Sequence, residues 1–408
     1  MTQPDPGPTA GQRPWRDTGW LIGQARALLD FHAGARDPAG GFRTLGPDGA
    51  PLGQTPRGRG AERALHDICR MVHGYALAEA VGGALAPPAA AALVEHGLDW
   101  LFDRQQDHRH GGFYWSVDDA GPVDDRKQAY GHAFVLLAAA SAARAGHDRA
   151  GRLRDLALDA IDRHFWEEPA GAVQDTFAAD WTGALPYRGQ NANMHLCEAL
   201  LAAHAVWGEP AHLARATCIA ERLIDREARQ AGWVVPEHFT AGWQRDDGFD
   251  GDAMFRPSGT TPGHALEWAR LVLELWARRG RRDDWMPGAA EALFRRAVAT
   301  GWLAEGGFAY TLDGGGAVSR RWRFWWPCAE GAAAARVLSD SLGGLPFAEA
   351  WYDRIWAVID ARFIDHARGG WHHEIDAAGR PATGLFPGKP DLYHALQACL
   401  ISARAMPG

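Results

Sequence analysis

Apolar residues recur along the chain at helical spacing, in two kinds of segment that alternate. In the first kind, charged residues gather on one face, which indicates a helix with one side in water. The sequence predicts six such outer helices, at residues 20–31, 91–104, 153–166, 213–228, 289–303 and 347–364. In the second kind, small and apolar residues cover nearly every face, which indicates a buried helix. Six of these inner helices are predicted, at residues 64–81, 129–145, 193–207, 263–278, 329–342 and 392–405.

A short glycine–aromatic motif separates each outer helix from the inner helix that follows it. The six motifs occupy residues 40–42, 111–113, 171–173, 231–233, 306–308 and 369–371, and the third, Gly-Ala-Val, is degenerate. Their middle residues are 71, 60, 60, 75 and 63 residues apart. A period of this length indicates a repeated unit of one outer helix, one loop and one inner helix.

Six such units predict an all-α fold, an (α/α)6 barrel in which six outer–inner helical hairpins close into two concentric layers. An open solenoid is the competing arrangement, but its terminal repeats normally carry polar caps, and here the last inner helix is as apolar as the rest. Long loops with short β-pieces, such as 307–312, are expected at the mouth. Residues 15–408 are predicted to form this single domain, after a disordered tail at 1–14.

Composition restricts the class of partner. The chain carries 42 Lys and Arg against 50 Asp and Glu, and the net charge of −8 argues against nucleic acid and against an anionic membrane surface. No apolar run is long enough to predict a membrane span. We therefore expect a small-molecule partner.

The cysteines indicate the compartment. They stand singly in apolar helical stretches, without a Cys-x-x-Cys pair, at Cys69, Cys197, Cys218, Cys328 and Cys399. This pattern is typical of buried, reduced thiols. The sequence therefore predicts a cytoplasmic protein.

Polar residues concentrate at the starts of the inner helices, which all enter from long loops and should therefore face one mouth of the barrel. They are Arg70 in the first, Lys127, Tyr130 and His132 at the second, Asn191 and His195 at the third, His264 and Glu267 at the fourth, Trp325, Trp326 and Glu330 at the fifth, and Asp391 and His394 at the sixth. We expect the imidazoles of His195, His264 and His394 to meet in one cavity. The partial positive charge of helix N-termini would favour a developing anion there.

The expectation of a shared cavity depends on three histidines at equivalent positions of the repeat, because a single histidine near a helix start is more often a capping or core residue. Six other histidines stand in polar contexts and are predicted to be surface residues: His32, His96, His108, His110, His147 and His212. The pair His372–His373 is left without a predicted role.

Two other uses of the same residues are considered. His264 and Glu267 form an isolated pair without a His-Glu-x-x-His motif, so no metal site is predicted and no cofactor is required. A glycoside hydrolase on this fold would need two carboxylates, for which the candidates by position are Glu198, Glu267, Glu330 and Asp391. A mouth rich in histidine suits proton transfer beside a carbonyl better than cleavage of an acetal.

Three segments resemble the N-acylglucosamine 2-epimerase superfamily: QNANMHLCEA at 190–199, RPSGTTPGHALEWAR at 256–270 and GKPDLYHALQ at 388–397. RMVH at 70–73 and RFWWPCAEG at 323–331 match two further family segments. Within the superfamily the chain looks closest to the branch of D-mannose isomerases and sulfoquinovose isomerase. The resemblance extends from about Trp20 to the C-terminus and implies the same (α/α)6 barrel.

Residue by residue, the resemblance implies that His264 and His394 are the acid/base histidines. It implies substrate contacts for Arg70, Tyr130, Asn191, His195, Arg256, Glu267 and the Trp325–Trp326 pair. His66 stands four residues before Arg70, where the family often has a tryptophan. The implied partner is a free monosaccharide.

The chemistry expected of such a site is aldose–ketose isomerisation. One acid/base group opens the pyranose, and a base then removes the C2 proton beside the C1 aldehyde, which suits an imidazole with a pKa of about 6.5. Arg70, permanently ionised, would stabilise the cis-enediolate. We expect His394 to move the proton between C2 and C1, and His264, positioned by Glu267, to open the ring.

The sequence therefore predicts an isomerase that interconverts D-mannose and D-fructose or a close hexose analogue. Return of the proton to C2 by a second histidine would instead make a sugar 2-epimerase, acting on N-acylglucosamine or a disaccharide such as cellobiose. An (α/α)6 glycoside hydrolase and a non-catalytic carbohydrate-binding barrel are the alternatives from other classes.

Overall fold

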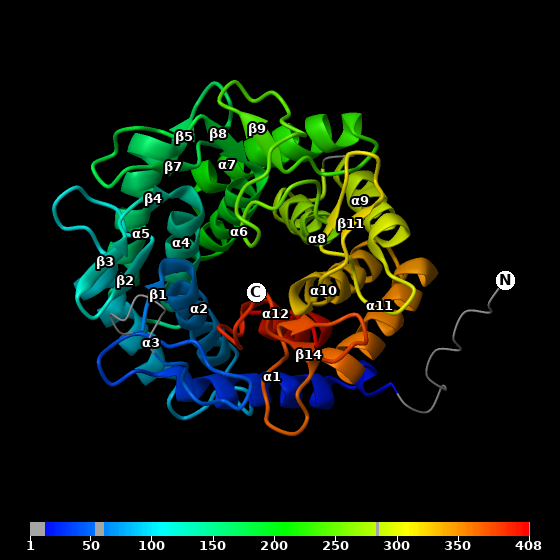
Figure 1. Cartoon of the computed structure of the whole chain (residues 1–408), viewed down its shortest axis with the longest axis horizontal. Coiled ribbons are helices and arrows are strands. Elements are labelled where there is room, and N and C mark those ends of the chain that lie inside the picture. The colour runs from blue at the N-terminus through cyan, green and yellow to red at the C-terminus, as the bar shows by residue number, and fades with distance from the viewer. Residues whose placement is uncertain (1–12, 54–60, 283–284, 408) are drawn as a thin grey trace.

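The computed structural model describes residues 13–53, 61–282 and 285–407. Within them, helices alternate between an outer and an inner layer around one axis, as Figure 1 shows. The outer helices are α1 (Thr18–His32), α3 (Ala90–Trp100), α5 (Ala150–Ala160), α7 (Pro210–Ala220), α9 (Trp285–Gly301) and α11 (Pro346–Val358). The inner helices are α2 (Leu65–Val81), α4 (Ala129–Arg144), α6 (Gln190–Trp207), α8 (Pro262–Arg278), α10 (Trp325–Ser341) and α12 (Tyr393–Ser402). The predicted (α/α)6 barrel is confirmed.

Four outer helices continue into a π-helical segment before the long loop: η3 (Leu101–Gln105), η4 (Ile161–Phe165), η5 (Glu221–Ala228) and η6 (Ile359–Phe363). A short 3-10 turn, η2 (Ala33–Ala35), follows α1 in the equivalent place. These segments lead the chain into the glycine–aromatic motifs. None of the helices in the described part of the chain combines the length and apolar character needed to cross a bilayer.

Each inner helix packs against the outer helix that follows it, as in α2 with α3 and α10 with α11. The connections within these pairs are short, which brings antiparallel helices together. The first outer helix, α1, packs against the last inner helix, α12, and closes the ring; Figure 1 shows α1 in blue beside α12 in red. The predicted order of outer and inner helices is therefore confirmed, while the hairpins that pack together are offset by one helix.

Short antiparallel strands join the loops around the mouth. The residues just before an inner helix pair with the loop that leads to the next inner helix. The strand pairs are β1 (Arg63–Ala64) with β2 (Ser116–Asp118), β4 (Lys127–Gln128) with β7 (Thr176–Phe177), β8 (Tyr187–Gly189) with β9 (His238–Thr240), and β12 (Arg323–Phe324) with β13 (Glu374–Ile375). Single bridges, Thr260–Leu312 and Leu45–Lys389, occupy the two remaining positions. Six pairings thus hold the six inner-helix starts in one ring.

The other strands extend or decorate this ring. β3 (Gly121–Asp124) and β14 (Pro381–Ala382) each add a third strand, while β5 (Trp166–Glu167) pairs with β6 (Ala172–Val173) and β10 (Thr311–Leu312) with β11 (Val318–Arg320). The predicted β-piece at 307–312 is present only at its end, as β10.

Buried ion pairs fasten several outer-helix ends to the inner-helix starts. In each pair, a buried cation just before an inner helix meets an aspartate of a glycine–aromatic turn, which also accepts backbone N–H groups of that turn. The pairs are Arg63–Asp37 at 2.7 Å, Lys127–Asp107 at 2.7 Å and Lys389–Asp365 at 2.8 Å. The side chains at the mouth therefore project from a rigid frame.

The predicted N-terminal tail, residues 1–14, lies outside the described residues except for Arg13 and Pro14. Pro14 opens a 3-10 turn, η1 (Pro14–Arg16), and Arg13 forms an ion pair with Asp353 on α11. The indole N–H of the buried Trp15 donates to the same carboxylate. Arg13 and Pro14 thus belong to a short segment that contacts outer helix α11, and the domain boundary stays a prediction.

Three burial predictions were wrong. Cys218 is exposed, because it lies on the wet face of outer helix α7, whereas the other cysteines are buried on inner helices. His32 and His212, predicted to lie at the surface, are buried. His32 ends α1, where the packing of α1 against α12 covers it, and its Nδ1–H donates to the Leu28 carbonyl.

Candidate active site

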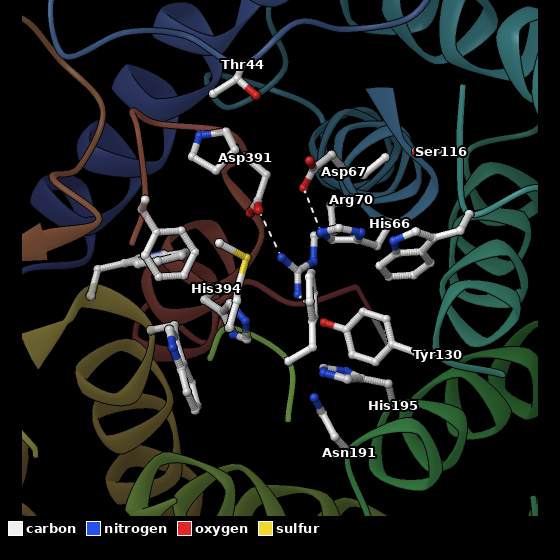
Figure 2. Close-up of a pocket in the computed structure, with 18 of the residues that line it drawn as sticks. Thr44, His66, Asp67, Arg70, Ser116, Tyr130, Asn191, His195, Asp391 and His394 are labelled. Atoms are coloured by element: carbon white, nitrogen blue, oxygen red, sulfur yellow. Dashed lines mark hydrogen bonds and ion pairs between the residues drawn. The ribbon is translucent and has the colours of Figure 1, made fainter. Parts of the chain in front are cut away.

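A cavity of about 330 Å³ lies at the mouth, among the starts of the inner helices. Side chains from all six inner helices and from several long loops line it, as Figure 2 shows in part. The predicted site residues that reach it are Arg70, Tyr130, Asn191, His195, His264, Glu267, Trp325, Trp326 and His394. The predicted meeting of three imidazoles in one cavity is therefore confirmed.

His394, in the first turn of α12, is held by a carboxylate of α10. Its Nδ1 lies 2.8 Å from Oε1 of Glu330. Burial would raise the pKa of Glu330, but the charge of Arg270 and the contact with His394 outweigh burial and lower it. An ionised carboxylate can only accept, so Nδ1 of His394 carries the proton and Nε2 remains as the basic nitrogen. Burial also lowers the pKa of His394, against the opposing effect of Glu330.

His264, at the start of α8, is held in the same way by Glu237. Its Nδ1 lies 2.9 Å from each oxygen of this carboxylate. Gln190 and the Thr261 backbone N–H also donate to Glu237. Burial would raise the pKa of Glu237, but the neighbouring His264 outweighs it and lowers it. His264 therefore presents Nε2 as its free ring nitrogen.

Glu237 corrects one sequence prediction, which made Glu267 the partner of His264. The pairing of β8 with β9 brings Glu237 to the start of α6, where its carbonyl accepts the N–H of Gln190. The loop residue Glu237, and not the helical residue Glu267, therefore forms the hydrogen bond with His264. The only signal for Glu237 in the sequence is a lone carboxylate in the apolar stretch 233–239.

Trp326 packs against both histidines. Its ring centroid lies 5.1 Å from that of His264 and 5.7 Å from that of His394. A side chain on Gly263 would place its Cβ 2.4 Å from the Trp326 ring, so this position requires glycine. Trp325 lines the cavity beside it and stacks on His373 at 3.5 Å, which gives one member of the His372–His373 pair a packing role.

Arg70 occupies the centre of the site. Figure 2 shows its guanidinium between Asp391 and Tyr130, where Nη1 donates to Asp391 at 2.9 Å and Nη2 to the Tyr130 hydroxyl at 2.9 Å. The rings of Phe134 and Tyr393 cover it at 4.7 and 5.0 Å. Burial would raise the pKa of Asp391, but Arg70 outweighs burial and lowers it. The site therefore contains a fixed cation, held by Asp391, which lies three residues before His394 in the chain.

His195 and Glu267 lie next to each other in the wall of the cavity. Nδ1 of His195 lies 3.3 Å from Glu198 and 3.7 Å from Glu267, and burial lowers the pKa of His195 to about 4. Both oxygens of Glu267 are buried and have no hydrogen-bond partner among the described residues. Burial and the carboxylates of Glu330 and Glu198 raise the pKa of Glu267 well above its usual range. At neutral pH we therefore expect a neutral His195 imidazole, beside a carboxyl group that keeps its proton to a higher pH than usual.

Three of the four carboxylates that were candidates for a hydrolase are engaged elsewhere, and Glu267 is the exception. Glu330 holds His394, Asp391 holds Arg70, and Glu198 accepts from the Tyr393 hydroxyl. Two sets of side chains have the composition of a cation site, His195, Glu198 and Glu267, and Glu267, Glu330 and His394, with ligand atoms within 4.8 Å of one another. Their imidazoles already contact carboxylates, and the absence of a metal stays a prediction.

Arg256 does not line this cavity. It lies in a small adjoining pocket, where it pairs with Asp175, donates to Thr176 Oγ1 at 2.9 Å and stacks over the Tyr187 ring. The preceding residue, Phe255, lines the cavity instead. The segment that was predicted to contact the sugar through Arg256 therefore contacts the cavity through the neighbouring residue, Phe255.

An aromatic cluster surrounds His66, four residues before Arg70. His66 stacks on Trp115, which comes from the loop before α4, at 5.1 Å. The ring of Phe255 packs edge-on against both. Close by, the sequence also missed a polar wall of the cavity, made of Thr44, Glu62, Asp67 and Ser116. Thr44, Glu62 and Ser116 lie on loops and strand ends, where helical periodicity does not identify them, whereas Asp67 lies in the first turn of α2.

Comparison with known proteins identifies the family and supports the fold. The family model described as N-acylglucosamine 2-epimerase matches residues 40–398. A D-mannose isomerase from Thermobifida fusca is 42% identical, over 93% of this chain and 92% of its own. The crystal structure of a D-mannose isomerase superposes with a TM-score of 0.87 at 29% identity, covering 95% of this chain and 98% of the other. A cellobiose 2-epimerase from Spirochaeta thermophila shares the fold, with a TM-score of 0.82 at 22% identity over 98% of this chain and 99% of its own.

Proposed function

The chain belongs to the N-acylglucosamine 2-epimerase family, and from this premise we propose that it is an aldose–ketose isomerase that interconverts D-mannose and D-fructose. The observation that carries the proposal is a pair of imidazoles, His264 and His394, in one cavity with the guanidinium of Arg70. The identity to D-mannose isomerases over nearly the whole chain supports the substrate and the outcome. Five cysteines without disulfides support a reducing compartment such as the cytoplasm.

Ring opening is assigned to His264. A pyranose opens when a proton moves from the anomeric hydroxyl and another reaches the ring oxygen. His264 accepts and returns a proton at Nε2, because Glu237 holds the Nδ1–H and stabilises the imidazolium that forms. The Trp326 ring, against which His264 packs, supplies an apolar surface for the sugar.

Proton transfer between carbons is assigned to His394. Its Nε2 removes the C2 proton of the open aldose, and Glu330 stabilises the imidazolium. Electrons from the C2–H bond form the C1–C2 double bond, and the aldehyde oxygen becomes an enediolate oxygen. The guanidinium of Arg70 stabilises this negative charge. Return of the proton to C1, with proton transfer from the C2 hydroxyl to the C1 oxygen, gives the ketose.

A 2-epimerase would differ only in the last step, when the proton returns to C2 from the opposite face. The shared fold of the cellobiose 2-epimerase does not separate the two outcomes. The 42% sequence identity to a D-mannose isomerase favours the ketose.

Incubation with D-mannose in heavy water, followed by NMR of the products, tests the proposal. We expect fructose as the main product, with solvent deuterium at C1 in part of it. Glucose alone would support a 2-epimerase. Release of sugar from a glycoside, without reaction of free mannose, would support a hydrolase.

A further inference from the structure

A buried arginine lies beneath the catalytic cavity without lining it. Arg270, on α8, is 2% exposed and is absent from the cavity wall. Its guanidinium contacts four carboxylates: Glu330 at 3.1 Å, Glu274 at 3.1 Å, Glu198 at 3.5 Å and Glu267 at 3.9 Å. The guanidinium of Arg270 thus compensates the charge of several carboxylates inside the barrel.

Two of these carboxylates hold cavity histidines. Glu330 uses Oε2 for Arg270 and Oε1 for His394, while Glu198 uses Oε1 for Arg270 and Oε2 for His195. Each carboxylate therefore bridges the guanidinium and an imidazole. Carboxylates this close repel one another in a medium of low polarity, and they take up protons unless a cation compensates them.

We propose that Arg270 is a positioning residue, which keeps Glu330 ionised and so holds His394 in the tautomer that presents Nε2 to the sugar. This inference rests on the proposed function, in which His394 moves the proton. With Arg270 present, the carboxyl group that takes up a proton most readily is Glu267, which lies farthest from the guanidinium, at 3.9 Å. Without Arg270, Glu330 also takes up a proton, and a protonated Glu330 no longer requires Nδ1–H on His394.

The geometry requires a guanidinium fork and not only a charge. Nε serves Glu330 and Nη2 serves Glu198, so two carboxylates are fixed at once. An ammonium group is a single point charge on a flexible stem, and it cannot hold both in place. Arg270→Lys should therefore keep part of the function, and Arg270→Ala should lose it.

A further pocket, beside Arg270, allows this idea to be tested by chemical rescue. This pocket has a volume of about 90 Å³, and Arg270, Glu198 and Glu274 line it. The three histidines of the catalytic cavity, His195, His264 and His394, do not line it. In Arg270→Ala, the deleted guanidinium leaves space that joins this pocket. Guanidinium ion at concentrations far below those that denature proteins can then take its place.

The experiment compares Arg270→Ala and Arg270→Lys with the full-length enzyme, using D-mannose as substrate. We expect kcat to fall about 10- to 100-fold in Arg270→Ala and less in Arg270→Lys, with KM nearly unchanged. Guanidinium chloride should restore kcat in Arg270→Ala, and sodium chloride should not. Glu274→Gln is the matched control, because Glu274 contacts Arg270 but no cavity histidine, and it should retain wild-type kcat.

The tautomer of His394 gives a readout that does not depend on turnover. Nitrogen NMR of ¹⁵N-histidine protein, with the signals identified by their loss in His394→Gln, should show Nδ1 protonated in the wild type and a tautomer mixture in Arg270→Ala. Unchanged kcat, or lost kcat with the wild-type tautomer, would overturn the inference. Should Arg270→Ala not fold, Arg270→Lys is measured in the same two ways. If the wild type does not convert mannose, the proposed function fails while the tautomer comparison still tests Arg270.

Discussion

The Nδ1 nitrogen of His394 lies 2.8 Å from Oε1 of Glu330, across the junction between inner helices α12 and α10. The contact between His264 and Glu237, at 2.9 Å, repeats it with a loop carboxylate in place of a helical one. Both imidazoles are therefore fixed through Nδ1 by an ionised partner. Because a carboxylate holds each imidazole through Nδ1, both histidines can act as bases through Nε2. One can then open the ring while the other deprotonates carbon.

Replacement of His394 should abolish proton transfer at C2. In His394→Gln we expect kcat/KM for D-mannose to fall by about 10²–10⁴, the usual contribution of a general base. Loss of deuterium exchange at C2 in heavy water should accompany this fall. The exposed His366, which contacts Asp360, supplies the control His366→Gln, and we expect that variant to keep full activity. Full mannose–fructose interconversion by His394→Gln would refute the assignment.

Replacement of Glu330 should change the pH profile. Activity requires neutral His394, so kcat/KM falls as pH decreases through the pKa of that imidazole. Burial and Arg70 lower this pKa, whereas Glu330 and Asp391 raise it. Glu330→Gln removes a negative charge, so the acid limb should move to lower pH, and the plateau should drop about 10- to 100-fold. A shift of the acid limb to higher pH, measured with D-mannose, would contradict this account.

Arg70→Lys should lower the turnover rate more than the affinity. The lysine cannot donate to Asp391 and support the enediolate with one rigid fork. We expect kcat to fall about 10²–10³, as for loss of one oxyanion donor, with a small change in KM. Thermal unfolding followed by circular dichroism checks that the barrel is intact. A variant with normal kcat and raised KM would show that Arg70 only binds the sugar.

Removal of a buried tether should destabilise the mouth. Lys127→Met leaves the Asp107 carboxylate buried without its cation, which should lower the free energy of unfolding by about 3–5 kcal/mol. The exposed neighbour Arg126, paired with Asp124, gives the control Arg126→Met, for which we expect a loss of about 0–1 kcal/mol. Urea unfolding measures both, and equal effects would contradict the tether.

The same tether predicts a pH dependence of stability. Burial would raise the pKa of Asp107, but Lys127 and backbone N–H groups outweigh burial and lower it. A carboxylate with a lowered folded pKa stabilises the protein above its unfolded pKa of about 3.9, and this stabilisation disappears as the pH falls through the folded pKa. The stability difference between wild type and Lys127→Met should therefore shrink in acid. A difference that grows in acid would reverse the sign of the argument.

Helical periodicity predicts most of this fold, because each turn of an outer helix carries charged residues on its solvent-exposed face, whereas an inner helix is apolar on nearly every face. It also predicts residues such as His195 and His394, because a polar side chain at the start of an apolar helix must face the mouth. Periodicity does not predict Glu237, which reaches His264 only through the pairing of β8 with β9. Likewise, Arg256 follows a turn at residues 253–255 and pairs with Asp175, away from the cavity. Contacts made by irregular loops depend on packing between distant segments, which one sequence does not display.

The central claim is that His394 carries one proton from C2 to C1. The most direct measurement uses D-mannose deuterated at C2, in ordinary water, with NMR analysis of C1 in the fructose formed. We predict that the wild type transfers part of the deuterium to C1 of fructose and makes little glucose, and that His394→Gln loses this transfer. Glucose formed as fast as fructose, or deuterium transfer that persists in His394→Gln, would contradict the claim.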